Sequence, residues 1–336
     1  MMRLGVLDQS PISEGSTAGQ ALRNTVELAQ LAEKLGYGRY WVAEHHGTPA
    51  LACASPEALI GPIAAATSQI RVGSGGIMLP HYSPLKVAET FSMLSGMFPG
   101  RIDLGIGRAA GTSPNIAFAL QRDRRQRAPD DFREQLEELL GYFGEVRWSG
   151  PTFISPEPYL LGSSPQSAVW AAELGLPYVF ADFINAHGSE IVEYYRERFR
   201  PSARWSKPYV IVAAWAICAE TDSEALRLSA PMRMMMTLLH RGTLIPVPTV
   251  EKAQHFLAQE GLSIDTMPPG RRLITGEPAR VHKALEDLSR EYGGPDETLI
   301  VNIMYDHALR MRSYELLAEE IGLAANTRAL AAASFD

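Results

Sequence analysis

The chain has 336 residues, of which 46% are hydrophobic and 21% are charged. This composition is ordinary for a globular enzyme and argues against a disordered chain. The formal net charge of -7 at pH 7 argues against a nucleic-acid-binding surface. Since no apolar stretch approaches the roughly 20 residues of a membrane span, and no basic segment precedes an apolar one at the N-terminus, we expect neither a membrane helix nor a signal peptide.

The chain alternates short apolar runs with amphipathic segments. The expected strands are residues 4–8, 40–43, 70–79, 101–106, 159–161, 178–181, 209–219 and 297–303. The expected helices are residues 17–35, 55–67, 83–97, 132–140, 168–174, 190–199, a segment starting at 221, 279–292 and 307–321. Gly36 is a typical helix stop, and Ser55-Pro56 and Ser83-Pro84 each combine a capping serine with a first-turn proline.

Eight strand–helix units with no internal change in composition predict one α/β domain over residues 1–336, a (β/α)8 TIM barrel. Residues 231–261 interrupt this rhythm and are the expected insertion or lid. The competing architecture is a doubly wound sheet, which calls for a Gly-x-Gly-x-x-Gly turn after the first strand. Residues 8–11, Asp-Gln-Ser-Pro, do not supply that turn.

The second strand ends in Glu44, His45 and His46, where barrel enzymes carry their functional groups. Adjacent residues on a strand point to opposite faces, so the two histidines should not enter the barrel mouth together. This pattern favours a catalytic or cofactor-facing histidine. A structural histidine is the first alternative, and a metal ligand is a weaker one because two neighbouring histidines cannot easily bind one ion.

Gly75 and Gly76 interrupt the third strand, and glycine within a strand indicates either a simple bulge or the close approach of a ligand. A planar ring system stacked on a strand needs such a surface without side chains. Two later strand ends offer phosphate donors. Arg108 follows one of them, and Gly162, Ser163, Ser164 and Ser167 precede a helix whose N–H groups suit an anion, with plain helix capping as the alternative.

A methionine cluster that includes Met232, Met235 and Met236 has helical core packing as its ordinary interpretation. An adaptable apolar substrate pocket is the alternative, because methionine packs against varied shapes. Cys53 and Cys218 are too few for a disulfide framework, which favours a reducing compartment, and we expect a cytoplasmic protein.

Taken together, these residues resemble the bacterial luciferase-like flavin monooxygenases. The likeness covers nearly the whole chain and is carried by residues 43–46, 73–80, 101–108, 162–174, 275–276 and 306–317. It implies a (β/α)8 barrel that uses reduced FMN supplied by a separate flavin reductase, or the deazaflavin F420. It further implies O2 attack by the flavin to give a C4a-hydroperoxide, a small and apolar organic substrate, and a homodimer.

The resemblance also implies roles for single residues. It assigns catalysis to His45 and a non-prolyl cis peptide beneath the flavin ring to Gly75-Gly76. It assigns the cofactor phosphate to Arg108, Ser163, Ser164 and Ser167. Because luciferase has a cysteine where this chain has Gly107 and a glutamate where it has Ser163, light emission is not expected.

Three alternatives compete with the flavin monooxygenase. F420-dependent hydride transfer would need a more basic groove, for which residues 122–127 are the one basic segment. A non-catalytic flavin-binding protein is disfavoured by the retained Glu44-His45-His46. A metal-dependent barrel hydrolase lacks the required ligand spacing, so no metal is expected.

Overall fold

The computed structural model describes residues 2–108, 114–121, 125, 130–144 and 154–323. The strands are β1 (Leu4–Asp8), β2 (Arg39–Val42), β3 (Arg71–Met78), β4 (Ile102–Gly107), β5 (Glu157–Gly162), β6 (Tyr178–Ala181), β7 (Val210–Cys218), β8 (Leu273–Gly276) and β9 (Glu297–Val301). The helices are α1 (Ala18–Leu35), α2 (Pro56–Ala66), the 3-10 helix η1 (Leu79–His81), α3 (Pro84–Met97), α4 (Pro114–Leu120), α5 (Phe132–Tyr142), α6 (Pro165–Leu174), α7 (Ser189–Arg198), α8 (Asp222–His240), α9 (Val250–Gln259), α10 (Pro278–Glu291) and α11 (His307–Ile321).

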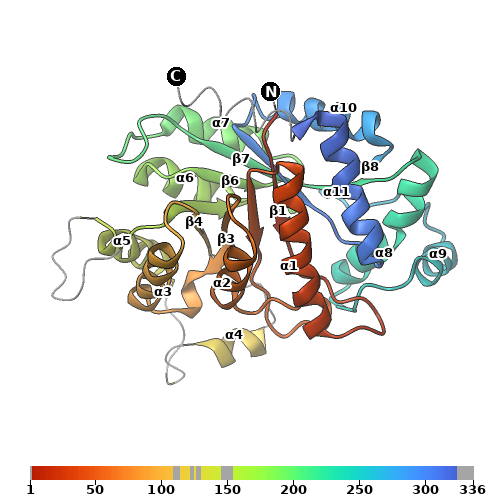
Figure 1. Cartoon of the computed structure of the whole chain (residues 1–336), viewed down its shortest axis with the longest axis horizontal. Helices are drawn as coiled ribbons and strands as arrows, with labels where there is room; N and C mark the ends of the chain where they lie inside the picture. Colours follow the sequence, from red (N-terminus) through yellow and green to blue (C-terminus); the bar gives the residue numbers. More distant parts are fainter. Residues whose placement is uncertain (1, 109–113, 122–124, 126–129, 145–153, 324–336) are drawn as a thin grey trace.

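Eight parallel strands of the described chain close into a barrel in the order β1 to β7 and then β9, which pairs with both β7 and β1. Helices surround this barrel (Figure 1). The predicted TIM barrel is therefore confirmed. The segment 273–276 forms an additional strand, β8, which pairs only with the carboxyl end of β7 and lies outside the ring.

Local capping explains why several helix ends were predictable, although the predicted capping serines Ser55 and Ser83 occupy the cap positions without a side-chain cap hydrogen bond. The hydroxyl of Thr17 accepts a hydrogen bond from the N–H of Gln20 at the start of α1, and Gly36 ends that helix with a φ of 88°. A positive φ is easy for glycine and strained for other residues, which makes glycine the common helix stop. Thr221 caps α8 in the same way as Thr17 caps α1.

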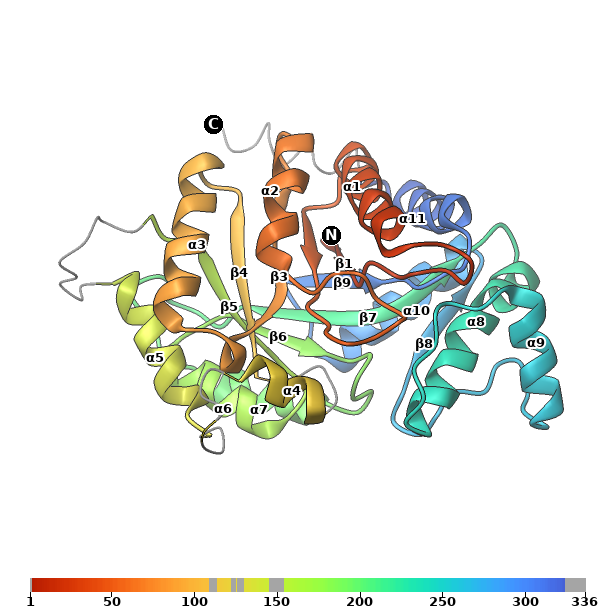
Figure 2. The ribbon, with the colours of Figure 1, turned by 90° about the horizontal axis from the view of Figure 1, so that it is seen from below.

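The predicted insertion at 231–261 does not begin at Pro231, because α8 continues through this proline to His240. A short connection then leads to α9, which packs beside α8 at one edge of the barrel (Figure 2). The segment is thus a pair of packed helices, and its action as a lid stays a prediction. Of the basic segment 122–127, residues Arg122, Arg124 and Arg127 lie outside the described part of the chain.

The amino-terminal half of the barrel interior is filled with charged and aromatic side chains. Arg39 of β2 pairs with Asp103 at 2.9 Å and with Glu297 at 2.8 Å, and all three are almost fully buried. The guanidinium of Arg39 lies 5.3 Å from the Trp41 ring and 5.0 Å from the Tyr159 ring. This layer fills the interior of the lower barrel, and the cavity among the described residues at the carboxyl ends of the strands lies above it.

A second buried ion pair joins the two ends of the chain. Asp8, at the end of β1, accepts a 2.6 Å bond from Arg310 of α11, and both side chains are at most 2% exposed. Tyr40 and Thr25 donate to the other oxygen of the same carboxylate. This shared acceptor fixes α11 against β1 and β2.

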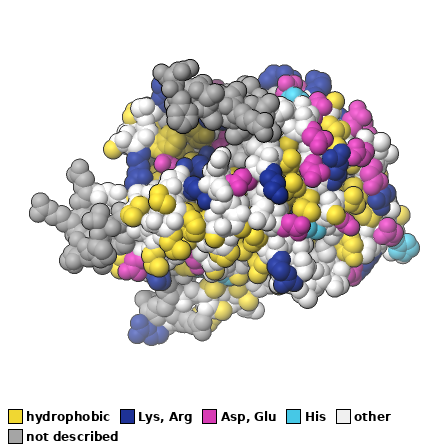
Figure 3. All heavy atoms as spheres, viewed as in Figure 1, with side chains coloured by type: hydrophobic (Ala, Val, Ile, Leu, Met, Phe, Trp, Pro, Cys, Tyr) yellow, Lys and Arg dark blue, Asp and Glu magenta, His cyan; other side chains and the backbone are white. Residues whose placement is uncertain are grey.

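No helix in the described residues combines the length and hydrophobicity that a membrane crossing requires. In Figure 3, acidic and basic side chains are interspersed over the side that carries α10 and α11, and hydrophobic side chains gather over the region of α2 and α3. Met93 and Met97 of α3 are each 67% exposed. A cluster of exposed apolar side chains of this kind is typical of an interaction surface.

Candidate active site

A cavity of about 560 Å³ opens at the carboxyl ends of β1 to β7. It brings together all eight residues that the sequence indicated for catalysis and cofactor binding, namely His45, Gly75, Gly76, Arg108, Gly162, Ser163, Ser164 and Ser167. These residues come from four different strand ends, so only the closure of the barrel places them around one space. This is the end at which barrel enzymes place their active sites.

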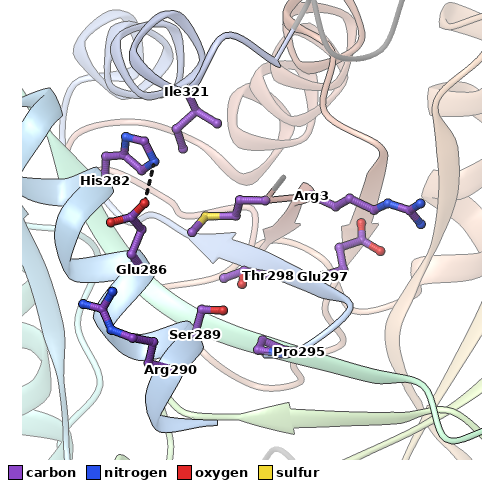
Figure 4. Close-up of a pocket in the computed structure, with 10 residues that line it drawn as sticks. Arg3, His282, Glu286, Ser289, Arg290, Pro295, Glu297, Thr298 and Ile321 are labelled. Atoms are coloured by element: carbon purple, nitrogen blue, oxygen red, sulfur yellow. Dashed lines mark ion pairs between the residues drawn. The ribbon is translucent and has the colours of Figure 1, made fainter. Parts of the chain in front are cut away.

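A larger cavity, of about 650 Å³, lies at the opposite, amino-terminal end of the barrel (Figure 4). It is lined by Arg3 and by α10 side chains, among which His282 and Glu286 lie 3.8 Å apart. It lies at the end where the strands start, and residues at that end of a barrel generally serve stability rather than catalysis. Volume alone therefore does not identify the site, and the smaller cavity at the carboxyl ends is the candidate.

His45 contributes a neutral imidazole to this cavity. Its backbone N–H is fixed by a 2.9 Å bond to the carbonyl of Cys53, whereas its buried Nδ1 has no hydrogen-bond partner among the described residues. Burial, together with the neighbouring His46, lowers the pKa of His45 to about 4. An uncharged ring with an unsatisfied nitrogen can donate or accept one further hydrogen bond, and a bound molecule can supply the partner.

Glu44 is buried and organises the backbone around His45. One carboxylate oxygen accepts from His46 Nε2 at 2.6 Å and from the Tyr82 hydroxyl at 2.9 Å. The other oxygen accepts from the N–H of Met78 at 2.8 Å. Burial and the carboxylate raise the pKa of Tyr82, so its hydroxyl stays protonated and donates. The two histidines are separated as strand alternation indicated, with His45 at the cavity and His46 held by Glu44.

The floor of the cavity is a surface without side chains. The Gly75–Gly76 peptide bond is cis. A Cβ on Gly76 would lie 2.9 Å from the carbonyl oxygen of Gly105, and one on Gly75 would lie 2.4 Å from Leu7. Because the obstacle at Gly76 is backbone, no side-chain movement could relieve it, and the position accepts only glycine.

Phosphate donors gather at the β4–β5 side of the cavity. Arg108 lies over the Trp170 ring at 5.3 Å and pairs with the exposed Asp130 at 3.1 Å. Such an exposed pair contributes little and can exchange for an anionic ligand. Ser163 is half-buried and Ser164 exposed at the start of α6, so both hydroxyls can reach a ligand.

Ser167 differs from the other two serines because it is buried and already engaged. Its hydroxyl donates to the carbonyl of Ser164 at 2.7 Å and contacts the Tyr178 hydroxyl at 2.9 Å. A Cβ on Gly162 would lie 2.2 Å from this hydroxyl. Ser167 thus shapes the loop beside the phosphate donors, and its direct contact with a phosphate stays a prediction.

The three methionines lie away from the cavity lining. Met232, Met235 and Met236 are at most 8% exposed and pack in a cluster with Phe183 and Trp215. Phe183 lines the cavity, so the methionines lie behind the cavity wall and pack against its outer side. This is the core packing that their spacing first indicated, and contact with a substrate stays a prediction.

Sequence reasoning missed several residues of the site. Phe132, Trp170, Phe183 and Ile184 give the cavity apolar walls, and Asn185 donates to the carbonyl of Ser163 at 3.1 Å. Trp170 and Phe132 lie on helices with rings 5.2 Å apart. Nothing in the local pattern separates them from ordinary core aromatics.

The residues present fit a phosphorylated flavin. The glycine floor at Gly75–Gly76 offers the flat surface that a ring system needs, and the unsatisfied Nδ1 of His45 can form a hydrogen bond with a polar group of the ring. The hydroxyls of Ser163 and Ser164, with Arg108, suit a phosphate. Among the described residues, no group of three or more histidine, cysteine or acidic side chains could hold a metal ion.

Residues 2–297 match the family model described as luciferase-like monooxygenase. The chain belongs to this family. It is 42% identical to the Bacillus subtilis protein YwcH over 95% of this chain and 99% of the relative. It is 38% identical to an Escherichia coli luciferase-like monooxygenase, covering 93% and 94%. It is 36% identical to the N-acetyl-S-alkylcysteine monooxygenase of Bacillus subtilis, covering 96% and 98%.

Solved structures agree with this membership. The luciferase-like chain superposes on apo-MsnO8 with a TM-score of 0.88 at 38% identity, covering 96% and 99% of the two chains. Two more distant structures share the fold. One is the oxygenating constituent of 3,6-diketocamphane monooxygenase with FMN, at a TM-score of 0.70 and 22% identity over 95% and 98%. The other is an F420-dependent secondary alcohol dehydrogenase with an F420-acetone adduct, at 0.64 and 18% over 96% and 99%.

Proposed function

We propose that this luciferase-like protein is a monooxygenase that uses reduced FMN and O2 to oxygenate a small, mainly apolar organic molecule. The observation that carries the proposal is the pairing of the Gly75–Gly76 floor with His45 in one cavity. The floor suits a planar ring, and His45 supplies a neutral hydrogen-bonding group at its edge. Reduced flavin, when bound, supplies the electrons that activate O2.

The chain's own residues bind, orient and exclude water. Ser163, Ser164 and Arg108 hold the phosphate and thereby set where the ring lies over the glycine floor. His45 holds a hydrogen bond, or takes up a proton transiently, at its unsatisfied Nδ1. Phe183 and Ile184 keep the substrate side of the cavity apolar. Exclusion of water from this side limits hydrolytic side reactions of the activated oxygen before it reaches the substrate.

One observation favours FMN over F420. Arg108 is the sole arginine or lysine among the described residues that line the cavity. One cation with two hydroxyls matches a single phosphate, whereas a long polyanionic tail calls for more positive charge. The F420-dependent enzyme remains the second candidate because it shares the same barrel.

The substrate and the partners extend the proposal. The relative named N-acetyl-S-alkylcysteine monooxygenase makes S-alkyl thioethers the first substrates to try. We further propose that a separate flavin reductase supplies reduced FMN. The exposed Met93 and Met97 support a homodimer that covers the face of α3.

The cofactor is tested by titrating the protein with FMN, riboflavin and F420, in both redox states, and following absorbance and fluorescence. We expect FMN to bind at least about tenfold more tightly than riboflavin, since a charge-assisted phosphate contact contributes about 1.5–3 kcal/mol. Arg108→Gln should narrow that difference and leave riboflavin binding nearly unchanged. Tighter binding of F420 than of FMN would replace the proposal by its alternative.

The role of His45 is tested with the reductase-coupled protein and a thioether substrate. His45→Ala should lower the product formed per O2 consumed and raise peroxide release, while the affinity for FMN changes little. His255→Ala serves as the control, because His255 lies exposed on α9 and does not line the cavity. Unchanged coupling of O2 consumption to product in the His45 variant would remove this role.

A further inference from the structure

A second cation lies beside the cavity, on the β6–β7 side. Arg271 lies two residues before the start of β8, and its Nη1 donates a 2.8 Å hydrogen bond to the carbonyl of Phe183. Phe183 lines the cavity, as do Ile184 and Ala213. Arg271 therefore contacts Phe183, which belongs to the apolar cavity wall that, under the proposed function, faces the substrate.

The segment that carries Arg271 is fixed on the loop after β6. The N–H of Ala186 donates to the carbonyl of Gly270 at 3.1 Å, and Arg272 Nη2 donates to the carbonyl of Ala186 at 2.6 Å. With the bond to Phe183, three contacts hold these two segments together. A cation held in one place loses less conformational freedom on binding an anion than a free surface arginine does.

The charge of Arg271 is not matched by a carboxylate. No acidic side chain of the described residues lies within ion-pair distance of it, whereas the adjacent Arg272 pairs with Glu291 at 2.6 Å. Partial burial lowers the pKa of Arg271, and no neighbouring charge opposes that effect. A guanidinium has five N–H donors, of which the Phe183 carbonyl takes one. The remaining donors can form a bidentate pair with a carboxylate.

Trp215 adds a second unused donor at the same place. Its ring lies 5.8 Å from the Arg271 guanidinium and 5.4 Å from the Phe183 ring. Trp215 follows the cavity-lining Ala213 by two positions on β7, so both side chains point to the barrel interior. The indole is 3% exposed, and its Nε1 is buried without a hydrogen-bond partner among the described residues. Buried donors of this kind are normally satisfied, which points to a ligand acceptor.

We propose that Arg271, together with the indole N–H of Trp215, binds a carboxylate of the organic substrate, so that the substrate class is an acid with an apolar portion. This inference rests on the proposed function, because it places the substrate in the same cavity. Its carboxylate would lie at the Phe183 wall, next to Arg271 and Trp215, which are not themselves lining residues. Arg108, Ser163 and Ser164 already provide for the cofactor phosphate on the β4–β5 side. The guanidinium of Arg271 is therefore not needed for the cofactor phosphate and can bind the substrate carboxylate.

The test compares two probes of equal size that differ in charge, N-acetyl-S-methylcysteine and its primary amide. Calorimetric titration is carried out on the whole protein, with and without FMN. We expect the wild type to bind the acid at least about tenfold more tightly than the amide. Arg271→Gln should abolish this preference and change the affinity for the amide less than about twofold.

Two further variants keep the test independent of folding defects. Arg271→Lys retains the charge and should keep part of the preference, because lysine lacks the planar fork. Arg280→Gln is the matched control, since Arg280 on α10 is 64% exposed and pairs with Asp222 outside the cavity lining. The Arg280→Gln variant should prefer the acid over the amide by the same factor as the wild type.

The outcomes separate this inference from the proposed function. Equal affinity of the wild type for the acid and the amide, or no measurable binding of the acid, overturns the inference even where FMN binds. A drop in FMN affinity in Arg271→Gln with the acid preference intact assigns the cation to the cofactor and overturns it as well. Absence of FMN binding by the wild type removes the proposed function, whereas the acid preference is still read from the samples without FMN.

Discussion

The carboxylate of Glu44 accepts a 2.8 Å hydrogen bond from the N–H of Met78, two residues beyond the Gly75–Gly76 peptide. Glu44 follows β2 and Met78 ends β3, so this bond ties the backbone next to His45 to the backbone of the glycine floor. The two parts of the candidate site are thus positioned by one buried side chain. Glu44 is a positioning residue in this arrangement.

Replacing Glu44 should therefore loosen both parts of the site at once. Glu44→Ala leaves the Met78 N–H and the Tyr82 hydroxyl without their acceptor, and we expect a loss of about 1–3 kcal/mol in the free energy of unfolding. FMN affinity should fall in parallel. Urea denaturation and flavin titration measure the two effects, with Glu89→Ala on the exposed face of α3 as control. An unfolding free energy equal to that of the control would contradict the role.

His45 should titrate far below a normal histidine. Burial lowers the pKa of His45 to about 4 in the folded protein. In the unfolded chain the same imidazole becomes protonated near pH 6.5, whereas in the folded chain it becomes protonated only near pH 4. The contribution of His45 to folding stability therefore falls as the pH drops through this window. Nuclear magnetic resonance of the imidazole, assigned with His45→Asn, should give the low pKa. A titration midpoint near 6.5 in the folded protein would show that the ring is not desolvated.

The glycine floor should tolerate no side chain at Gly76. Gly76→Ala places a Cβ 2.9 Å from the Gly105 carbonyl oxygen, and overpacking of this kind is expected to cost about 1–3 kcal/mol. Gly107→Ala is a control on the next strand, because its Cβ would meet nothing closer than 3.7 Å. Chemical denaturation of both variants checks the difference. Equal stability of the two would mean that β3 and β4 can separate at this point.

The buried pair between Asp8 and Arg310 should be far more sensitive than the ion pairs on the surface. Arg310→Met strips the buried Asp8 of its charge partner, and breaking such a pair costs about 3–5 kcal/mol. Arg312, two residues along α11, makes only exposed or half-exposed pairs, so Arg312→Met should change stability by about 1 kcal/mol or less. Thermal unfolding of the two variants measures the contrast, which a similar shift in both would refute.

Local signals in the sequence were sufficient for the eight strands of the barrel and for most of the helices around it, but not for β8, α4 or α9. Thr17, Gly36 and Thr221 act within one or two helical turns, so their caps can be recognised without knowing the rest of the fold. The alternation of strands and helices predicts a barrel, and the barrel in turn places every strand end on one rim. This is why the sequence could predict that His45, Gly76 and Ser163 lie around one cavity, whereas their roles there stay predictions.

Contacts between distant segments were decided only by the tertiary structure. Asp8 and Arg310 are separated by 302 positions, and neither has a local pattern that indicates a partner. The same holds for Arg271, whose sequence context is that of an ordinary surface arginine but whose side chain lies against the Phe183 carbonyl and the Trp215 ring. A sequence determines propensities over a few residues, whereas burial and charge pairing depend on which segments the closed barrel brings together.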